Sequence, residues 1–305
     1  MFAVIDLGSN SFHLLIADYD NGHFTVVDRH SERVQLAEKL RTTGLLQAQA
    51  MDRGLQCLRN FRSIIDRYAI EKLSAVATQA LRQASNAADF LTSAKAVGFD
   101  IDVISGQREA ALIYRGICDP LPDSNINRLI IDIGGASTEI ALGCDQNILV
   151  AESFPIGCVS WRDQFFSNPL DYAAQAPTAK QEARQMFEPL REQLNKYGWE
   201  EAYASSGSAK MLTNISIANH DGDGTLTIGC LEKIEAILQP YHDTSAVTIP
   251  GLKPERYDLL APGLAIMYCI MQCMNIDSLR YSHTALREGI LHEISSHRVD
   301  YHLDN

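Results

Sequence analysis

The sequence predicts an α/β protein built from two similar domains. Apolar stretches bounded by turn residues alternate with amphipathic helical stretches along the whole chain. The phrase VIDLGSNSFHLLIAD at 4–18 also returns as IIDIGGASTEIALG at 130–143. A length of 305 residues suits two ordinary domains, and we expect them to cover 1–122 and 123–305.

The first half begins as an antiparallel meander of three strands, with Asn21-Gly22 as the turn signal of one hairpin. Apolar residues then recur at three- and four-residue steps from Met51 to Tyr68, which indicates an amphipathic helix. The expected order is strands at 2–7, 12–19 and 24–33, a helix at 51–68, a strand at 73–78, helical residues to about 97, a strand at 101–106 and a helix at 108–116.

The second half repeats this pattern after PLPDSN at 120–125, a polar stretch that we expect to separate the domains. RLIIDIGG, STEIALG and NILVAESFPIG predict three strands, 178–197 predicts a helix, and EAYASSG and SLRYS predict further strands. The apolar stretch 259–274 contains Pro262 and Gly263 and is shorter than the ~20 residues of a membrane-spanning helix. We therefore expect a buried helix there.

The composition is that of a globular protein with an acidic excess. Hydrophobic residues make up 46% of the chain, and 26 Lys and Arg face 38 Asp and Glu, for a formal charge of −12. This charge repels nucleic acids and acidic membranes, so we expect neither as a partner. The start MFAVIDLG has no signal-peptide pattern, and the seven cysteines form no CxxC pair. Both features favour a cytoplasmic protein with reduced thiols; whether it forms a homodimer stays open.

The repeated phrase places the same turn in both halves, because aligning Asp6 with Asp132 superposes the pattern D-x-G-x-x-S. A glycine turn between strands lets backbone N–H groups point at an anion, since no side chain blocks the approach. The candidate phosphate-binding residues of the two turns are Gly8, Ser9, Asn10, Ser11, Gly134, Gly135, Ser137 and Thr138.

Each turn follows an aspartate, Asp6 or Asp132. A carboxylate beside a bound phosphate is repelled unless a cation lies between them, so the two aspartates predict Mg²⁺ held by carboxylate and phosphate oxygens. The alternative is that each aspartate hydrogen-bonds its own backbone and only forms the hairpin turn. A dinucleotide-binding motif is excluded, because a strand rather than a helix follows the glycines.

Further candidates follow other predicted strands. Glu109 in ISGQREAALIYRG is a candidate base for an attacking water, or an acidic residue that the helix dipole favours. Arg82 in ATQALRQASN suits bidentate phosphate contact, or forms a surface ion pair. Gly207 and Ser208 in SSGSAKML, and Arg287 in ALREGIL, begin helices where phosphate could be held.

These motifs resemble the exopolyphosphatase and guanosine pentaphosphate phosphohydrolase (Ppx/GppA) family, in the same order and along nearly the whole chain. They are DLGSNSFHLLIA, RVQLAEKL, ATQALRQASN, ISGQREAALIYRG, IDIGGASTEI, GCVS, SSGSAK and ALREGIL. Their residues are more similar to those of the exopolyphosphatases. The resemblance implies an actin-like fold of two ribonuclease-H-like domains with an interdomain cleft. It also implies Mg²⁺-dependent release of a terminal phosphate from polyphosphate, or of the 5′ γ-phosphate from pppGpp.

By motif, the resemblance makes Glu109 the catalytic glutamate and makes Asp132 and Glu139 the acidic pair that handles metal and water. It also places both glycine turns and Arg82 on the phosphate-binding loops. Ala136 departs from the family pattern G-G-G-S-T, and Arg108 replaces an acidic residue before Glu109. The sequence ends before the helical C-terminal domains of longer members, which leads us to expect short polyphosphates or a nucleotide as substrate.

Two other functions fit parts of this pattern. An actin-fold kinase would transfer the γ-phosphoryl group of ATP to a hydroxyl, and it would need an adenine pocket and a substrate-side carboxylate. A non-catalytic sensor would bind (p)ppGpp without turnover. Free phosphate released without an acceptor distinguishes hydrolysis from both.

Overall fold

The structure is a computed structural model that describes residues 1–20, 23–166, 171–219, 223–240 and 248–296. The chain forms two compact units, Met1–Gly116 together with the residues from Thr284, and Ile117–His283. The expected turn at Asn21-Gly22 lies outside the described residues.

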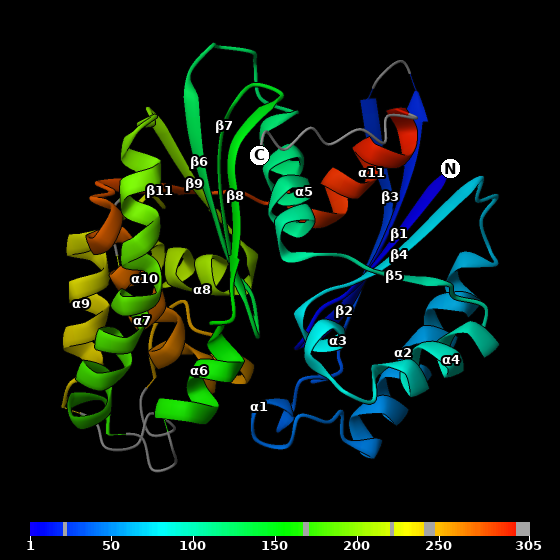
Figure 1. Ribbon diagram of the computed structural model, residues 1–305, viewed down its shortest axis with the longest axis horizontal. Helices are drawn as coiled ribbons and strands as arrows, with labels where there is room; N and C mark the ends of the chain where they lie inside the picture. Colours follow the sequence, from blue (N-terminus) through cyan, green and yellow to red (C-terminus); the bar gives the residue numbers. More distant parts are fainter. Residues whose placement is uncertain (21–22, 167–170, 220–222, 241–247, 297–305) are drawn as a thin grey trace. The chain divides into compact units, whose positions relative to one another are not determined.

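The first unit is a five-stranded sheet with helices on both faces (Figure 1). The strand order is β3-β2-β1-β4-β5, in which β1 is antiparallel to β2 and parallel to β4. The expected meander is thereby confirmed. The elements are β1 Phe2–Leu7, β2 Ser11–Asp20, β3 His23–Arg33, α1 Leu40–Thr43, α2 Ala48–Ile65, β4 Lys72–Ala77, α3 Gln79–Gln83, α4 Ala87–Ala96, β5 Ile101–Val103, α5 Gly106–Cys118 and α11 Leu286–Ser296.

The last helix, α11, packs in the first unit, whereas the sequence led us to place it in a second domain over 123–305. It lies against β1 and β4, and its Ile290 and Leu291 side chains are buried. Glu288 pairs with Arg29 of β3 at 3.2 Å. These contacts join residues more than 200 positions apart, so no local sequence pattern could predict them.

The second unit is a six-stranded sheet in the order β10-β11-β9-β6-β7-β8. Read from β8 to β11, it repeats the order and directions of the first sheet, so each unit has the ribonuclease-H-like arrangement. Its elements are β6 Asn127–Ile133, β7 Thr138–Cys144, β8 Asn147–Phe154, α6 Cys158–Phe165, α7 Tyr172–Asn195, β9 Glu201–Ser205, α8 Ser206–Ala218, β10 Leu226–Thr227, α9 Ile228–Leu238, the 3₁₀ helix η2 Pro254–Arg256, α10 Tyr257–Met274 and β11 Ser278–Tyr281.

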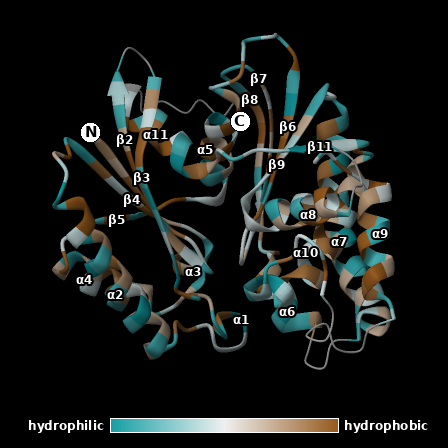
Figure 2. Ribbon diagram, turned by 180° about the vertical axis from the view of Figure 1, so that it is seen from behind, coloured by the Kyte–Doolittle hydropathy of each residue, from teal (hydrophilic) through white to brown (hydrophobic). Residues whose placement is uncertain are grey.

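The core of the second unit lies between one face of its sheet and helices α7, α8 and α10. Alternate residues of the central strands enter this core, such as Ile131 and Ile133 of β6 and Ile140 of β7. Figure 2 shows these central strands as largely hydrophobic. By length and composition the helical stretch Pro254–Met274, which includes α10, could cross a membrane. However, 78% of its most apolar 18-residue window is buried inside the protein, which agrees with the buried helix expected at 259–274.

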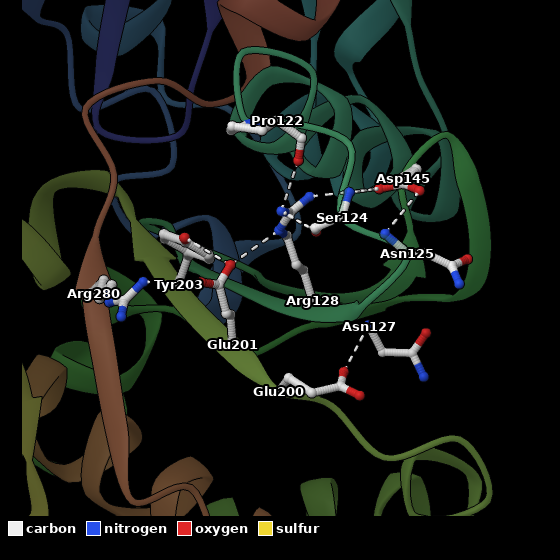
Figure 3. Close-up of polar contacts among 10 residues, drawn as sticks. All are labelled: Pro122, Ser124, Asn125, Asn127, Arg128, Asp145, Glu200, Glu201, Tyr203 and Arg280. Carbon is white, nitrogen blue, oxygen red and sulfur yellow. Dashed lines mark hydrogen bonds and ion pairs between the residues drawn. The ribbon is translucent and has the colours of Figure 1, made fainter.

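The expected domain separator, 120–125, is part of the second unit (Figure 3). The buried Arg128 guanidinium donates to the Pro122 carbonyl at 3.0 Å and to Ser124 Oγ at 2.6 Å, and it pairs with Glu201 of β9 at 3.1 Å. Asp145 also accepts a hydrogen bond from the Ser124 N–H. This network ties the stretch to the sheet and explains why the units divide after Gly116 instead of after Pro122.

Replacing Glu201 with glutamine is expected to destabilise the protein by about 1–3 kcal/mol at neutral pH, because buried Arg128 loses a charged partner. Burial raises the pKa of Glu201, but hydrogen bonds from Arg128 and Tyr203 outweigh it and leave the pKa lowered. The stabilisation is therefore present above the ordinary carboxyl pKa and is lost as pH falls through the lower folded-state value. Urea unfolding should show the difference at pH ~7 and a smaller one near pH ~3; an equal difference at both would contradict this account.

Candidate active site

Both predicted glycine turns are present, each after the first strand of its unit. Gly8 begins the connection from β1 to β2, and Gly134 begins the one from β6 to β7. The Gly134 N–H donates to the Ser137 carbonyl at 2.9 Å. A Cβ on Gly8 would lie 2.8 Å from the Ser11 carbonyl oxygen, so the turn needs glycine there. The turns are confirmed as turns, and their binding of phosphate stays a prediction.

Both turns are held through their carbonyl groups. The supporting N–H groups follow the third strand of each unit, and the bonds measure 2.8–3.1 Å. They run from Val34, Gln35 and Ala37 to the Asn10 and Ser9 carbonyls, and from Cys158, Val159 and Ser160 to the Gly134 and Gly135 carbonyls. The C=O and N–H groups of a trans peptide lie on opposite sides. The N–H group that follows each held carbonyl therefore points away from the N–H groups that bind that carbonyl. This geometry suits an anion site built from backbone N–H groups.

The polar side chains of the turns are less available for phosphate binding than the sequence suggests. Ser9 and Ser137 are buried. The Thr138 hydroxyl donates to the Ile156 carbonyl at 2.5 Å, and a hydroxyl has one proton to donate. In this geometry Thr138 can contribute to anion binding through its backbone only. Asn10 Nδ2 donates to Ser11 Oγ at 3.5 Å, at the limit of a hydrogen bond.

The predicted acidic pair, Asp132 and Glu139, lies on neighbouring strands. The two residues are directly opposite each other in the β6–β7 ladder, and both are buried. Their side chains point to the sheet face opposite the hydrophobic core, since Ile131 and Ile140 beside them enter that core. Unit negative charges about 5 Å apart repel by about 3 kcal/mol at an effective dielectric constant near 20. A cation between the two carboxylates would relieve this repulsion.

The first unit has one carboxylate where the second has two. Asp6 corresponds to Asp132, but the residue opposite Asp6 across the ladder is His13, in the place of Glu139. The structure therefore puts two of the three predicted metal ligands side by side, and the third, Asp6, in the other unit. The role of Asp6 toward a metal stays a prediction.

Glu109 and Arg82, predicted as base and phosphate ligand, form an ion pair with each other. Arg82 Nη1 lies 2.8 Å from Glu109 Oε2 and 2.9 Å from the Ile104 carbonyl oxygen. Arg82 Nε and Nη2 both donate to Gln79 Oε1, at 3.1 and 2.8 Å. Glu109 is buried in the first turn of α5, after β5, as expected. Arg82 is thus used to hold Glu109, in addition to any contact with a phosphate.

The start of α8 holds the predicted residues Gly207 and Ser208. Ser206 before them has φ +73°, a left-handed conformation that is strained for serine, and its hydroxyl donates to the Ile133 carbonyl at 2.6 Å. A Cβ on Gly207 would lie 2.5 Å from Arg256 Nη1, so the glycine lets a guanidinium reach the helix start. Within the described part of the chain, Arg256 forms no salt bridge.

The buried Cys158 thiol is near Ser208, and burial raises its pKa. The thiol therefore stays protonated at neutral pH and is a poor nucleophile. This argues against a covalent cysteine intermediate at this part of the second unit.

The last predicted residue, Arg287, lies in the first turn of α11 in the first unit. It is half-buried, and it forms no hydrogen bond or ion pair with the residues that the structure describes. Binding of phosphate by Arg287 therefore stays a prediction.

Three residues near these sites were not among the site residues predicted from the sequence. Ser205 and Ser153 flank the acidic pair, and Arg256 lies against Gly207. Ser153 could have been found from the register of the second hairpin, and Ser205 is the first residue of the SSGSAK motif. Arg256 comes from a distant segment, so only the folded chain reveals it.

The chain belongs to the Ppx/GppA phosphatase family, whose model matches residues 15–297. It is 39% identical over 294 residues to a Haemophilus influenzae protein that carries the provisional name exopolyphosphatase, covering 96% of this chain and 90% of that one. It is 34% identical over 297 residues to a guanosine-5′-triphosphate,3′-diphosphate pyrophosphatase of Photobacterium profundum, covering 97% of this chain and 59% of that longer protein.

Solved structures agree with this membership. An exopolyphosphatase from Cytophaga hutchinsonii superposes with a TM-score of 0.86 at 27% identity, covering 96% of this chain and 97% of that one. An Aquifex aeolicus member of the Ppx/GppA family superposes with a TM-score of 0.78 at 25% identity, covering 98% and 99%. The chain therefore has the predicted actin-like fold of two ribonuclease-H-like units, and it is a phosphohydrolase rather than a kinase or a non-catalytic sensor.

Proposed function

We propose that the protein releases the terminal phosphate of inorganic polyphosphate, or the 5′ γ-phosphate of pppGpp, by direct attack of water with Mg²⁺. The observation that carries the proposal is the buried pair Asp132 and Glu139. The pair lies beside a glycine turn whose carbonyl groups accept hydrogen bonds from the start of α6, which leaves its own N–H groups to face an anion. The names of the relatives, an exopolyphosphatase and a pppGpp-type pyrophosphatase, support the two substrate classes.

The acidic pair fits magnesium better than a softer metal. Both side chains offer hard oxygen ligands, and a serine hydroxyl donates to each. Within the described residues, no three His, Cys, Asp or Glu side chains gather into a complete metal site. A two-carboxylate site suits Mg²⁺, which commonly keeps waters and binds substrate phosphate oxygens. When bound, Mg²⁺ supplies positive charge that offsets the charge of the transferring phosphoryl group.

The proposed reaction assigns a chemical role to each of the candidate residues. The Glu109 carboxylate orients the water and accepts its proton as the new O–P bond forms and the P–O bond to the leaving phosphate breaks. Arg82 holds the Glu109 carboxylate in one orientation. The N–H groups of the glycine turns stabilise the transferring group. Arg256, at the start of α8, adds positive charge for the rest of the phosphate chain.

The proposal predicts phosphate release that depends on a divalent cation. We expect purified protein to release phosphate from tripolyphosphate or pppGpp with MgCl₂ and to lose nearly all activity with excess EDTA, measured by a phosphate assay without any acceptor. The expected preference for short chains predicts slower turnover per protein with long polyphosphate at equal concentration of chain ends. Full activity in EDTA, or no release from any of the three substrates, would contradict the proposal.

A further inference from the structure

The acidic pair lies in a row of four polar residues that crosses four strands. Ser205 of β9 is opposite Asp132 of β6, Asp132 is opposite Glu139 of β7, and Glu139 is opposite Ser153 of β8. Strand order is β9-β6-β7-β8, so the two carboxylates occupy the middle and the two serines the outside. All four side chains point to the same face of the sheet.

Each serine hydroxyl donates to the carboxylate next to it. Ser205 Oγ lies 2.5 Å from Asp132 Oδ2, and Ser153 Oγ lies 2.7 Å from Glu139 Oε1. A hydrogen bond to an ionised oxygen is stronger than one between neutral groups. Ser205 is completely buried, so its bond with Asp132 is protected from water.

The two hydrogen bonds act in opposite directions along the row. Ser205 draws Asp132 toward β9, and Ser153 draws Glu139 toward β8. Two carboxylates that face each other would otherwise repel and rotate away from each other. The serines restrict this rotation, which keeps a gap between two oxygen ligands.

We propose that Ser205 and Ser153 are positioning residues that set the spacing of Asp132 and Glu139 for a divalent cation. This inference rests on the magnesium part of the proposed function. Hydrogen-bond partners of metal ligands typically change metal affinity by about 10–100-fold when they are removed. The two serines are not expected to touch the substrate.

The test measures Mg²⁺ binding without substrate. Ser205→Ala and Ser153→Ala should each weaken Mg²⁺ binding about tenfold by isothermal titration calorimetry, and should reduce the rise in Tm that MgCl₂ causes. Ser153→Thr keeps the hydroxyl at a half-buried strand position and should restore near wild-type affinity. Ser216→Ala removes a buried hydroxyl from α8, about 15 Å further along the helix than Ser206, and is the matched control.

The outcomes separate this inference from the proposed function. Wild-type Mg²⁺ affinity in folded Ser153→Ala and Ser205→Ala would overturn the positioning role and leave the proposed function intact. If Ser205→Ala does not fold, Ser153→Ala alone decides, because its side chain is half-buried. A wild-type protein that binds no Mg²⁺ yet releases phosphate in EDTA would overturn both this inference and the magnesium part of the proposed function.

Discussion

Replacing Glu109 with glutamine is expected to slow phosphate release from tripolyphosphate by about 10²–10⁴-fold while the protein keeps its fold. Glutamine has nearly the same shape but accepts no proton and carries no charge, so it cannot act as the base. The side chain is buried at the start of α5 and is fixed by Arg82, which limits any replacement of its role by a nearby water. Initial-rate phosphate assays over a range of substrate concentrations should show the loss in kcat.

Glu293→Gln is the matched control for this variant. Glu293 is also a buried glutamate of the first unit, and it pairs with an arginine, Arg108, at 3.1 Å. The same charge is removed, but activity per folded protein should stay near wild type. Equal losses in both variants would show that buried charge, and not base catalysis, accounts for the effect.

The ion pair with Arg82 gives this prediction a second part. If Arg82 acts mainly by holding Glu109, Arg82→Ala should lower kcat, but should add little when combined with Glu109→Gln. If Arg82 acts instead as a separate phosphate ligand, the two effects should be nearly additive and the single variant should raise KM. Rates of the wild type, both single variants and the double variant decide between these results.

Replacing Gly116 or Gly289 with alanine is expected to prevent normal folding of the first unit. A Cβ on Gly116 would lie 1.9 Å from the Ala285 carbonyl oxygen, and a Cβ on Gly289 would lie 1.9 Å from the Leu112 carbonyl oxygen. Helices α5 and α11 therefore cross with backbone against backbone. Forcing atoms into such a contact costs about 1–3 kcal/mol when the neighbours can shift and more when they are backbone, as here.

Denaturant unfolding monitored by circular dichroism should show each variant destabilised by about 3 kcal/mol or more, or unfolded from the start. Gly229→Ala in α9 is the control, because a Cβ there would meet only Thr227 Oγ1 at 3.9 Å. It should be neutral or slightly stabilising, since alanine favours helix more than glycine does. Wild-type stability in Gly116→Ala and Gly289→Ala would show that the helices can move apart without cost.

The elements that depend on local patterns could be predicted from the sequence. The strand at 2–7 and the helix near 51–68 were expected within a few residues of β1 and α2, because their patterns are clear. The helix expected at 178–197 is α7, but it begins earlier, at Tyr172, and contains Pro177. Boundaries were less accurate where the chain changes direction. The strand expected at 101–106 ends at Val103, because Gly106 already begins α5.

The features set by long-range contacts could not be predicted in this way. The packing of α11 in the first unit depends on Gly116 and Gly289, which lie in the motifs ISGQREAALIYRG and ALREGIL, but nothing local indicates that the two motifs touch. The use of Arg82 as the partner of Glu109 depends on a contact across 27 positions. The acidic pair was found because both residues lie in motifs, whereas the pairing of Ser205 and Ser153 with it became visible only from strand register.

The order of the two units along the chain has a consequence for synthesis in the cell. The second unit is continuous in sequence, whereas the first unit needs α11, which follows it. A nascent chain can therefore complete the later unit while the earlier one still exposes the β1 and β4 surface that α11 covers. We expect the N-terminal half to need protection from aggregation until α11 has been translated.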